Sequence, residues 1–299
     1  MDAFFSSELF FSEETLNAIH LYAGPLMDYF MRGVTALGGH WFFYLALPLV
    51  YWCIDTRTAV KIGAVFFFSA IFNTLAKDLF NNPRPDPEKL APPIRDLFLI
   101  YSPRSPGFPS GHTQGTIAFW GAAMAFTRKK RVLIAGALLF VLMPYSRMYL
   151  GVHFLGDVLG GYVFGVLCLL VMLPVVFRCE HKQFPSHDII ALLLTAAPWA
   201  VYAAYPQRFL FMNLSLLAGL AAGLIMAKER ISFNARNSTA AQVIKAAIGF
   251  AGLAAIIFGL NVSGRNPGMV FFQNWVSGFW VTFIAPLLFS RVPHLKGAD

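Results

Sequence analysis

Charged residues are scarce in this chain of 299 residues, and their scarcity indicates its class. Asp, Glu, Lys and Arg together make up 13% of the sequence, whereas about 25% is usual in soluble domains. Hydrophobic residues make up 57%. A soluble globule of this length would lack the polar side chains needed to cover its surface. The bilayer is therefore predicted to be the solvent for much of the chain.

Cysteine and acidic residues are also few. Cys53, Cys168 and Cys179 each lie in or beside an apolar run without metal-ligand spacing, which argues against a disulfide framework. No acidic cluster suits a magnesium ion, so neither a metal nor another cofactor is expected. The net charge of +8 comes mostly from short loops between apolar runs. Membrane topology and anionic headgroups explain such charges, and nucleic acid is not expected as a partner.

Apolar runs near the length needed to cross about 30 Å of hydrocarbon recur along the sequence. Nine are expected, over 33–54, 58–80, 110–128, a run ending near 147, 152–177, 189–205, 209–227, 240–260 and 274–290. A mixture of apolar and polar positions over 8–30 predicts an N-terminal amphipathic helix on the membrane surface. The stretch 81–109 contains eight prolines and cannot be one continuous helix. The predicted fold is an all-α, polytopic transmembrane helical bundle of about nine spans.

Basic residues cluster on alternate turns of this expected zigzag. They are Arg57 and Lys61, Arg128 to Arg131, Arg178 and Lys182, and Lys228, Arg230 and Arg236. The positive-inside rule places these turns in the cytoplasm. The proline-rich stretch, the end of the fourth span and the start of the fifth are then expected on the opposite side. Nine spans would place the N-terminus outside and the C-terminus inside.

Three segments on that outer side hold residues suited to binding an anion. Lys77, Arg84 and Arg147 are cations at the outer ends of spans, where ionisable residues are usually functional. Three cations at one depth repel one another unless an anion lies among them. Arg offers a planar fork that fits phosphate oxygens, and Lys offers a point charge.

The same segments contain groups suited to acid–base and nucleophilic chemistry. Ser110 is predicted to cap a helix whose first residues are Gly111 and His112. Free amides at a helix N-terminus form an anion site, and a glycine lets the backbone approach closely. His153 and Asp157 are four residues apart and share one helical face. The carboxylate can accept a hydrogen bond from one imidazole nitrogen and leave the other as a nucleophile.

Each of these residues has an ordinary explanation when taken singly. The Lys could snorkel, the Arg could set topology, the Ser could only cap a helix, and the His and Asp could share a local hydrogen bond. Taken jointly, these explanations would have to account for a full set of phosphate-binding groups at one depth and on one side. We therefore interpret the residues as one site.

The three segments resemble the three motifs of the type 2 phosphatidic acid phosphatase (PAP2) superfamily, which are K-x6-R-P, P-S-G-H and S-R-x5-H-x3-D. The matching residues are Lys77, Arg84 and Pro85, then Pro109 to His112, then Ser146, Arg147, His153 and Asp157. All three motifs match with their internal spacings, and the resemblance covers about residues 58–177.

The resemblance implies a role for each matching residue. His153 is expected to attack phosphorus and form a phosphohistidine, and Asp157 to orient it. His112 is expected to protonate the leaving oxygen and then to activate water. The groups expected to bind the phosphoryl oxygens are Lys77, Arg84, Ser110, the amide of Gly111, and Arg147. No metal is expected in this site, because the cations take its place.

The function expected from this resemblance is a metal-independent membrane phosphatase that hydrolyses a lipid phosphate monoester or diphosphate. Its expected partners are the lipid phosphate substrate and membrane lipids. We expect it in a bacterial inner (cytoplasmic) membrane, with its active site on the non-cytoplasmic side. Three alternatives stay open. They are a sugar-phosphate phosphatase of the glucose-6-phosphatase type, suggested by the nine-span outline, an anion or lipid transporter that uses the same basic site, and a transferase that moves phosphate between lipids through the same phosphohistidine.

The chain is expected to have three parts. These are an N-terminal interfacial segment over 1–32, a PAP2-like catalytic transmembrane core over 33–177, and a C-terminal transmembrane extension over 178–299. The extension lies beyond the motif resemblance. Shaping a substrate groove, mediating homodimerisation and thickening the scaffold are three roles for it that the sequence leaves open.

Overall fold

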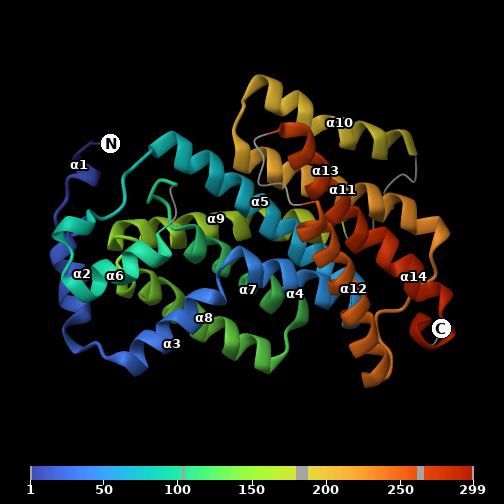
Figure 1. Ribbon diagram of the computed structural model, residues 1–299, viewed down its shortest axis with the longest axis horizontal. Coiled ribbons are helices and arrows are strands. Elements are labelled where there is room, and N and C mark those ends of the chain that lie inside the picture. The colour runs from blue at the N-terminus through green and yellow to red at the C-terminus, as the bar shows by residue number, and fades with distance from the viewer. Residues whose placement is uncertain (1, 103–104, 180–187, 261–265, 298–299) are drawn as a thin grey trace. The chain divides into compact units, whose positions relative to one another are not determined.

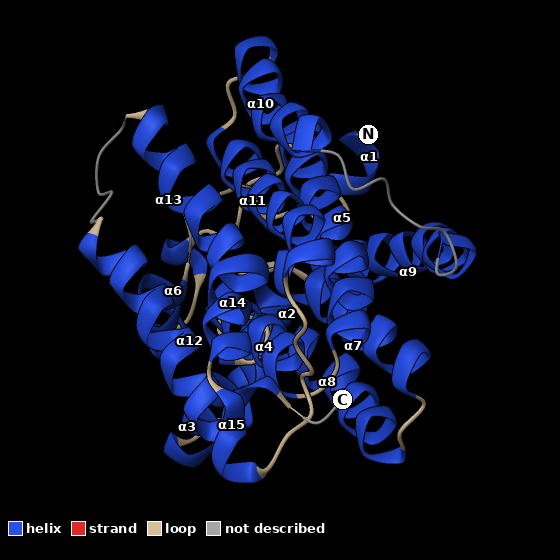
Figure 2. Cartoon of the chain, turned by 90° about the vertical axis from the view of Figure 1, so that its right-hand side faces the viewer, coloured by secondary structure: helices blue, strands red, loops and turns tan. Residues whose placement is uncertain are grey.

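The computed structural model describes residues 2–102, 105–179, 188–260 and 266–297. Over these residues the chain is helical and contains no strand, so the prediction of an all-α fold is confirmed (Figures 1 and 2). Lys182, one of the predicted cytoplasmic basic residues, lies outside the described residues. The chain divides into two compact units, one made of Met1–Phe43 and Ile62–Phe177, the other of Tyr44–Lys61 and Arg178–Asp299.

Six stretches of helix among the described residues are long and apolar enough to cross a membrane, and the chain is an integral membrane protein. They are α5 (Thr56–Phe80), α8 (Lys130–Tyr149), α9 (Leu155–Cys179), α11 (Arg208–Arg230), α12 (Thr239–Gly259) and the stretch Pro267–Arg291. The last stretch comprises α13 (Pro267–Phe279), the π-helical turn η3 (Trp280–Ile284) and α14 (Ala285–Arg291).

The predicted count of nine spans is not confirmed. Two predicted spans, α7 (Gly111–Thr127) and α10 (Asp188–Ala204), have 17 residues each. At 1.5 Å per residue such a helix is about 26 Å long, which is shorter than the hydrocarbon core of about 30 Å. The predicted first span over 33–54 is divided between α3 (Pro25–Ala36) and α4 (His40–Cys53), which are bent by 53°. This pair is a seventh span if the two helices are taken together.

The N-terminal segment, predicted as one amphipathic helix over 8–30, is divided into short elements. They are α2 (Glu13–Ile19), η1 (His20–Tyr22) and the start of α3, and a further short helix, α1 (Asp2–Phe5), precedes them. Ser12 caps α2, and Gly24 before α3 has an extended backbone. Proline has no backbone N–H and disfavours the α conformation in the residue before it. A helix therefore cannot run through Gly24 and Pro25.

The proline-rich stretch 81–109 is not one helix, as predicted. It contains the short turn η2 (Pro87–Lys89) and the helix α6 (Pro92–Tyr101), which both begin at prolines. Proline suits the first turn of a helix because the N–H that it lacks would have no partner there. Loops on either side of these elements lead to the ends of α5 and α7.

Glycines on α9 allow this helix to lie close to α7 within the first unit. A Cβ atom added at Gly161 would lie 2.8 Å from the carbonyl oxygen of Ser110, and one at Gly165 would lie 2.9 Å from the Cβ of Ile117. Both distances are shorter than real Cβ contacts. The two helices can therefore touch only because these positions, four residues apart, lack side chains.

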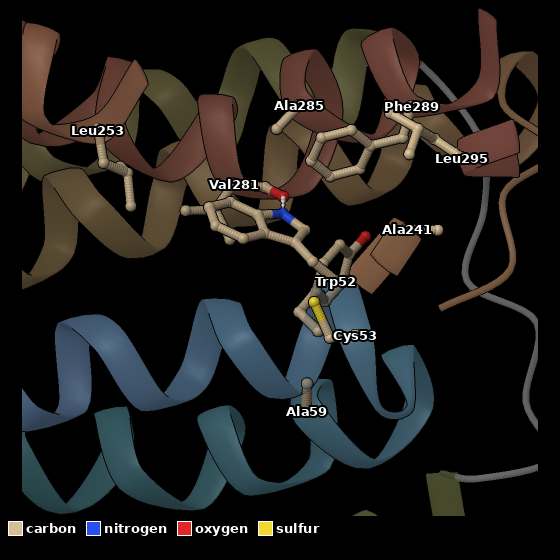
Figure 3. Close-up of a cluster of buried hydrophobic side chains, with 10 residues drawn as sticks. Trp52, Cys53, Ala59, Ala241, Leu253, Val281, Ala285, Phe289 and Leu295 are labelled. Atoms are coloured by element: carbon tan, nitrogen blue, oxygen red, sulfur yellow. Dashed lines mark hydrogen bonds between the residues drawn. The ribbon is translucent and has the colours of Figure 1, made fainter. Parts of the chain in front are cut away.

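The core of the second unit forms around the fully buried Trp52 (Figure 3). Its indole Nε1 donates a hydrogen bond of 2.8 Å to the carbonyl oxygen of Val281. The ring of Phe289 meets it edge-on, with ring centroids 6.1 Å apart. Leu295 of the last helix, α15 (Pro293–Lys296), belongs to the same cluster. The large ring is thus buried with its one polar atom satisfied.

The contact between α7 and α9 predicts a strong effect of one methyl group. We expect Gly161→Ala to lower the melting temperature in detergent, by an amount equivalent to about 1–3 kcal/mol, because the added Cβ would collide with the Ser110 backbone. Gly33→Ala is the matched control, since a Cβ at this α3 position meets nothing within 4 Å. Equal melting temperatures for the two variants would contradict the close packing of these helices.

Candidate active site

All eight predicted site residues lie in the first unit, at helix ends or in the loops beside them. Lys77 is in the last turn of α5, Arg84 in the loop after it, Ser110 at the cap of α7, Gly111 and His112 in its first turn, Arg147 in the last turn of α8, His153 before α9, and Asp157 in the first turn of α9. Two helices end here and two begin here, so residues distant in sequence can meet.

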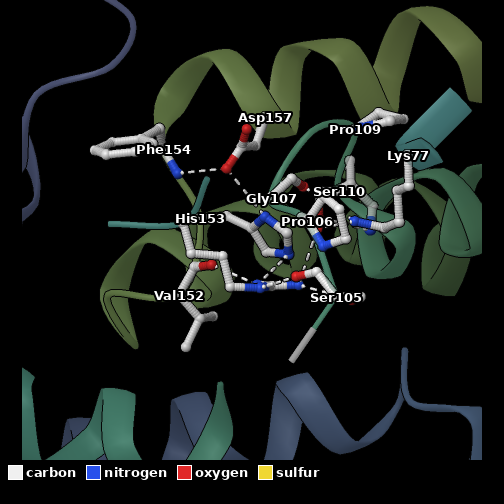
Figure 4. Close-up of polar contacts among 12 residues, drawn as sticks. Lys77, Ser105, Pro106, Gly107, Pro109, Ser110, Val152, His153, Phe154 and Asp157 are labelled. Carbon is white, nitrogen blue, oxygen red and sulfur yellow. Dashed lines mark hydrogen bonds and ion pairs between the residues drawn. The ribbon is translucent and has the colours of Figure 1, made fainter. Parts of the chain in front are cut away.

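The imidazole of His153 lies between a carboxylate and a guanidinium. Its Nδ1 is 3.2 Å from Oδ2 of Asp157 (Figure 4), and its Nε2 is 3.2 Å from Nη1 of Arg84. A guanidinium can only donate hydrogen bonds, so Nε2 accepts one with its lone pair. The single ring proton of a neutral imidazole then sits on Nδ1 and is donated to the carboxylate. This tautomer makes Nε2 the nucleophilic atom of the ring.

Asp157 is held in place by the residue before its own helix and by the cap of α7. Its Oδ2 also accepts a hydrogen bond of 3.0 Å from the backbone N–H of Phe154. Its carbonyl oxygen accepts one of 2.9 Å from the N–H of Ser110, which ties the starts of α9 and α7 together. The side chain of Asp157 is fully buried. The carboxylate therefore has a fixed position from which to orient the imidazole.

Arg84 is anchored by backbone carbonyl groups on two sides. Its Nε donates to the carbonyl oxygen of Ser105 at 2.8 Å, and its Nη1 donates to that of Val152 at 2.6 Å. Burial lowers the pKa of Arg84 to about 10, and the carboxylate of Asp157 opposes this shift. The guanidinium is therefore still a cation at neutral pH.

Lys77 and Arg84 reach a common oxygen atom. The Nζ of Lys77 donates to the carbonyl oxygens of Pro106 and Gly107, the latter at 3.1 Å. The Nη2 of Arg84 donates to the same Pro106 oxygen at 3.4 Å. Figure 4 shows Lys77 directed at Pro106 and Gly107, in the loop before α7. Because one carbonyl oxygen receives hydrogen bonds from both side chains, one small anion in that place would also be within reach of both.

Two glycines let the loops approach the carboxylate and one another. Gly151 has φ of +69°, in the left-handed region that favours glycine, and a Cβ there would lie 2.4 Å from the Cγ2 of Ile94. A Cβ at Gly107 would lie 2.9 Å from Oδ2 of Asp157. The loop before α7 can therefore run directly over the His153–Asp157 pair only with glycine at this position.

Arg147 is buried, with 1% of its surface exposed, and does not use all its donors. Its Nη1 donates to the Oγ1 of Thr35 at 2.8 Å, and its Nε has no hydrogen-bond partner in the described part of the chain. A buried donor without a partner costs roughly 1–3 kcal/mol, which indicates a place for an acceptor. Of the three cations, Arg84 contacts the imidazole of His153 directly.

The residues at the start of α7 form no hydrogen bond to the imidazole of His153 in the described part of the chain. The hydroxyl of Ser110 accepts hydrogen bonds from the N–H of Thr113 at 3.5 Å and from its hydroxyl at 3.1 Å, as expected of a helix cap. Within the described residues, half-buried His112 makes no hydrogen bond to the other seven predicted residues.

Sequence reasoning missed two residues that hold this arrangement. Thr35 gave no signal, because a single Thr in an apolar run belongs to no motif. Asn73 could have been noticed as a polar residue inside the span over 58–80. Its Nδ2 donates to the carbonyl oxygen of Pro109 at 3.3 Å and to Oε1 of Gln114 at 2.8 Å, so it fastens the start of α7 to α5.

The groups present suit an anion with an electrophilic centre. They are three cations, a carboxylate and an imidazole lone pair, which together match the charge and geometry of a phosphoryl group. In the ranges that the structure describes, no group of three or more His, Cys, Asp or Glu residues could hold a metal ion.

Comparison with known proteins places these residues in a recognised domain. Residues 58–181 match the model described as the PAP2 superfamily, and residues 211–297 match the one described as the PAP2 superfamily phosphatase transmembrane extension. The first match contains all eight predicted site residues.

Several curated proteins and one solved structure are similar to the chain. It is 24% identical over 191 residues to the dihydrosphingosine 1-phosphate phosphatase of Saccharomyces cerevisiae, covering 60% of this chain and 46% of that protein. It is 29% identical over 164 residues to phosphatidylglycerophosphatase B of Bacillus subtilis, covering 50% of this chain and 74% of that protein. The chain thus spans about half the length of many curated relatives that it matches.

The solved structure is the crystal structure of a transmembrane PAP2 type phosphatidylglycerolphosphate phosphatase from Bacillus subtilis. It is 26% identical to this chain, with a TM-score of 0.44. The similarity covers 58% of this chain and 87% of that chain.

The cation cluster predicts binding of a small anion. We expect inorganic phosphate to raise the melting temperature of the purified protein, because the anion relieves repulsion among the cations. At a phosphate concentration a hundred times the Kd for phosphate, the stabilisation should be equivalent to about 2.7 kcal/mol. Chloride at equal ionic strength is the control. Arg84→Ala should remove the phosphate effect. A phosphate effect that persists in this variant would place the anion elsewhere.

Proposed function

The chain belongs to the PAP2 superfamily, and we propose that it is a metal-independent membrane phosphatase that hydrolyses a lipid phosphate monoester or diphosphate. The observation that supports this most is the environment of His153. Its Nε2 lone pair faces a guanidinium, and its Nδ1 faces a carboxylate. An imidazole held in this tautomer among three cations is arranged to attack phosphorus.

In the first step, Nε2 of His153 attacks phosphorus. A P–N bond forms as the P–O bond to the lipid breaks, and the bonding electron pair leaves with the lipid oxygen. His112, in its protonated form, gives that oxygen its proton, so a monoester departs as the lipid alcohol and a diphosphate as the lipid monophosphate. Arg84 must release Nε2 at this stage, and its donors are then free for phosphoryl oxygens.

In the second step, water attacks the phosphohistidine. His112, now neutral, takes a proton from the water as the P–N bond breaks, and inorganic phosphate leaves. Asp157 stabilises the positive charge that the His153 ring acquires while it is phosphorylated. The histidines return to their starting protonation states, so the cycle is balanced.

The phosphoryl charge is stabilised by fixed donors. Lys77 and Arg84 already converge on one oxygen atom, and Arg147 keeps a buried Nε without a partner in the described residues. The N-terminal amides of α7, beginning at Gly111 after the Ser110 cap, add a further anion-binding group. Charge stabilisation of this kind is the main means of catalysis in phosphoryl transfer.

A lipid is the proposed substrate because the site lies at the ends of membrane helices and the relatives named above are phosphatases of lipid phosphates. The sphingoid phosphate and phosphatidylglycerophosphate classes in those names are the first to test. On this proposal, the segment over 33–177 is the catalytic core, and the parts over 1–32 and 178–299 support it.

The catalytic proposal predicts phosphate release in the presence of a metal chelator. We expect the purified protein to release phosphate from long-chain lipid phosphates and not from glucose 6-phosphate. His153→Ala should abolish turnover, because the variant lacks the nucleophile that forms the proposed intermediate. Release from the sugar phosphate alone would favour the sugar-phosphate alternative, and anion uptake into proteoliposomes without hydrolysis would favour a transporter.

In the same assay, Asp157→Asn should lower kcat by roughly 10- to 150-fold, because a hydrogen bond to a charged group contributes about 1.5–3 kcal/mol. Asp96→Asn is the matched control, since Asp96 is an exposed carboxylate of α6 outside the site. Activity of His153→Ala equal to that of the wild type would overturn the mechanism.

We place the site on the non-cytoplasmic side of a bacterial inner membrane. Arg57 and Lys61 are near the start of α5, which ends at the site, and Arg128 to Arg131 join the far ends of α7 and α8. The positive-inside rule puts those ends in the cytoplasm. In a variant without native cysteines, a membrane-impermeant thiol reagent added to intact spheroplasts should label Leu99→Cys and not Lys129→Cys. The reverse pattern would contradict this orientation.

A further inference from the structure

Residues 4–36 lie outside the matched domain and contact the segments that carry Arg84, Arg147 and Asp157. Glu13 accepts a hydrogen bond of 3.1 Å from the N–H of Asp86, two residues after Arg84. The carbonyl oxygen of Phe10 accepts one of 2.8 Å from the N–H of Gly156, beside Asp157. These contacts hold the loops that carry the site residues.

The most direct of these contacts is a chain of hydrogen bonds from Arg147 through Thr35. Nη1 of Arg147 lies 2.8 Å from Oγ1 of Thr35, which lies 3.1 Å from Oγ of Ser146. The hydroxyl of Ser146 donates at 2.7 Å to the carbonyl oxygen of Met143. At most 5% of the surface of Thr35, Ser146 or Arg147 is exposed, so water does not compete for these bonds.

The direction of this chain follows from which groups can donate. The guanidinium has no acceptor atom, so the Thr35 oxygen must accept from it. The Ser146 proton goes to the Met143 carbonyl, so the Thr35 proton is donated to the Ser146 oxygen. Each hydroxyl therefore both accepts and donates, and the Thr35 hydroxyl has one satisfied arrangement. Replacing it with a methyl group would leave Nη1 of Arg147 without this acceptor.

We infer that Thr35 is a positioning residue that fixes the guanidinium of Arg147, so that its unpartnered Nε is presented to a phosphoryl oxygen. This inference rests on the proposed function, because it assigns Arg147 to phosphate binding. An arginine side chain otherwise has about 2 kcal/mol of rotamer entropy to lose on binding an anion. Thr35 removes that freedom before the substrate arrives, which is the effect of a preorganised site.

The inference also gives α3 a defined role. α3 carries Thr35 in its last turn, two residues before the break at 37–39. Near the end of α3, the hydroxyl of Thr35 contacts Ser146 and Arg147 close to the end of α8. The site is therefore completed by a residue that the matched PAP2 domain, 58–181, does not contain.

The test compares Thr35→Val, which keeps the shape and removes the hydroxyl, with Thr35→Ser, which keeps the hydroxyl. We expect Thr35→Val to lower kcat/KM for a lipid phosphate roughly 10- to 100-fold, and Thr35→Ser to stay within about threefold of the wild type. In an Arg147→Ala background, Thr35→Val should have no further effect, because Thr35 acts through Arg147. Wild-type kcat/KM in Thr35→Val, or an undiminished effect in the Arg147→Ala background, would overturn the inference.

A binding measurement separates this inference from the proposed function. The rise in melting temperature with inorganic phosphate should shrink in Thr35→Val and remain in Thr35→Ser, whether or not the protein turns over a substrate. A wild type that binds phosphate but hydrolyses no phosphate ester would defeat the proposed function alone. An unchanged phosphate response in Thr35→Val would defeat the positioning role alone. If Thr35→Val does not fold, Thr35→Ala is measured by the same criteria.

Discussion

The site depends on one constraint: the imidazole of His153 lies between a carboxylate, which can only accept a hydrogen bond, and a guanidinium, which can only donate one. Asp157 accepts a hydrogen bond from the Nδ1–H group, and Arg84 can approach Nε2 only as a donor. The ring is buried, so water cannot reverse this arrangement. The proton position therefore follows from the neighbours, and the nucleophilic atom faces the cations. Every proposed step of phosphoryl transfer begins from that orientation.

Glycines determine how closely the elements around the site can pack. Gly161 brings the backbones of α9 and α7 together, and Gly107 lets a loop pass over Asp157. Lys77 and Arg84 donate to neutral backbone carbonyl groups of this loop. An anionic phosphoryl oxygen is a stronger acceptor than a carbonyl, particularly in a buried site of low dielectric constant. The exchange of these carbonyl groups for phosphoryl oxygens, as hydrogen-bond acceptors of the cations, is therefore favourable.

Sequence patterns predicted the part of the fold that depends on local chemistry. The spans over 58–80 and 152–177 correspond to α5 and α9, since long apolar runs need no tertiary information. The count of nine was not reached, because hydropathy does not reveal that α7 has only 17 residues or that α3 and α4 are bent. Gly24 and Pro25 are a recognisable helix-breaking pair. The amphipathic pattern over 8–30 continues across them, and for this reason the prediction did not include the break.

The motif spacings predicted which residues would gather, and their roles stay proposals. The His153–Asp157 contact could be foreseen because both lie four residues apart at the start of one helix. The contacts of Arg84 with the loop before α7, and of Arg147 with Thr35, could not. They join residues 21 and 112 positions apart through tertiary packing, which no local pattern encodes.

The most direct measurement is a crystal or cryo-electron microscopy structure of the protein with orthovanadate, which adopts the geometry of a phosphoryl group under attack. The account predicts vanadium bonded to Nε2 of His153, with its equatorial oxygens accepting hydrogen bonds from Arg84 and Arg147. Arg84 should have left Nε2, and Asp157 should still hold Nδ1. Vanadium bonded to Nδ1, or seated away from His153, would contradict the central claim.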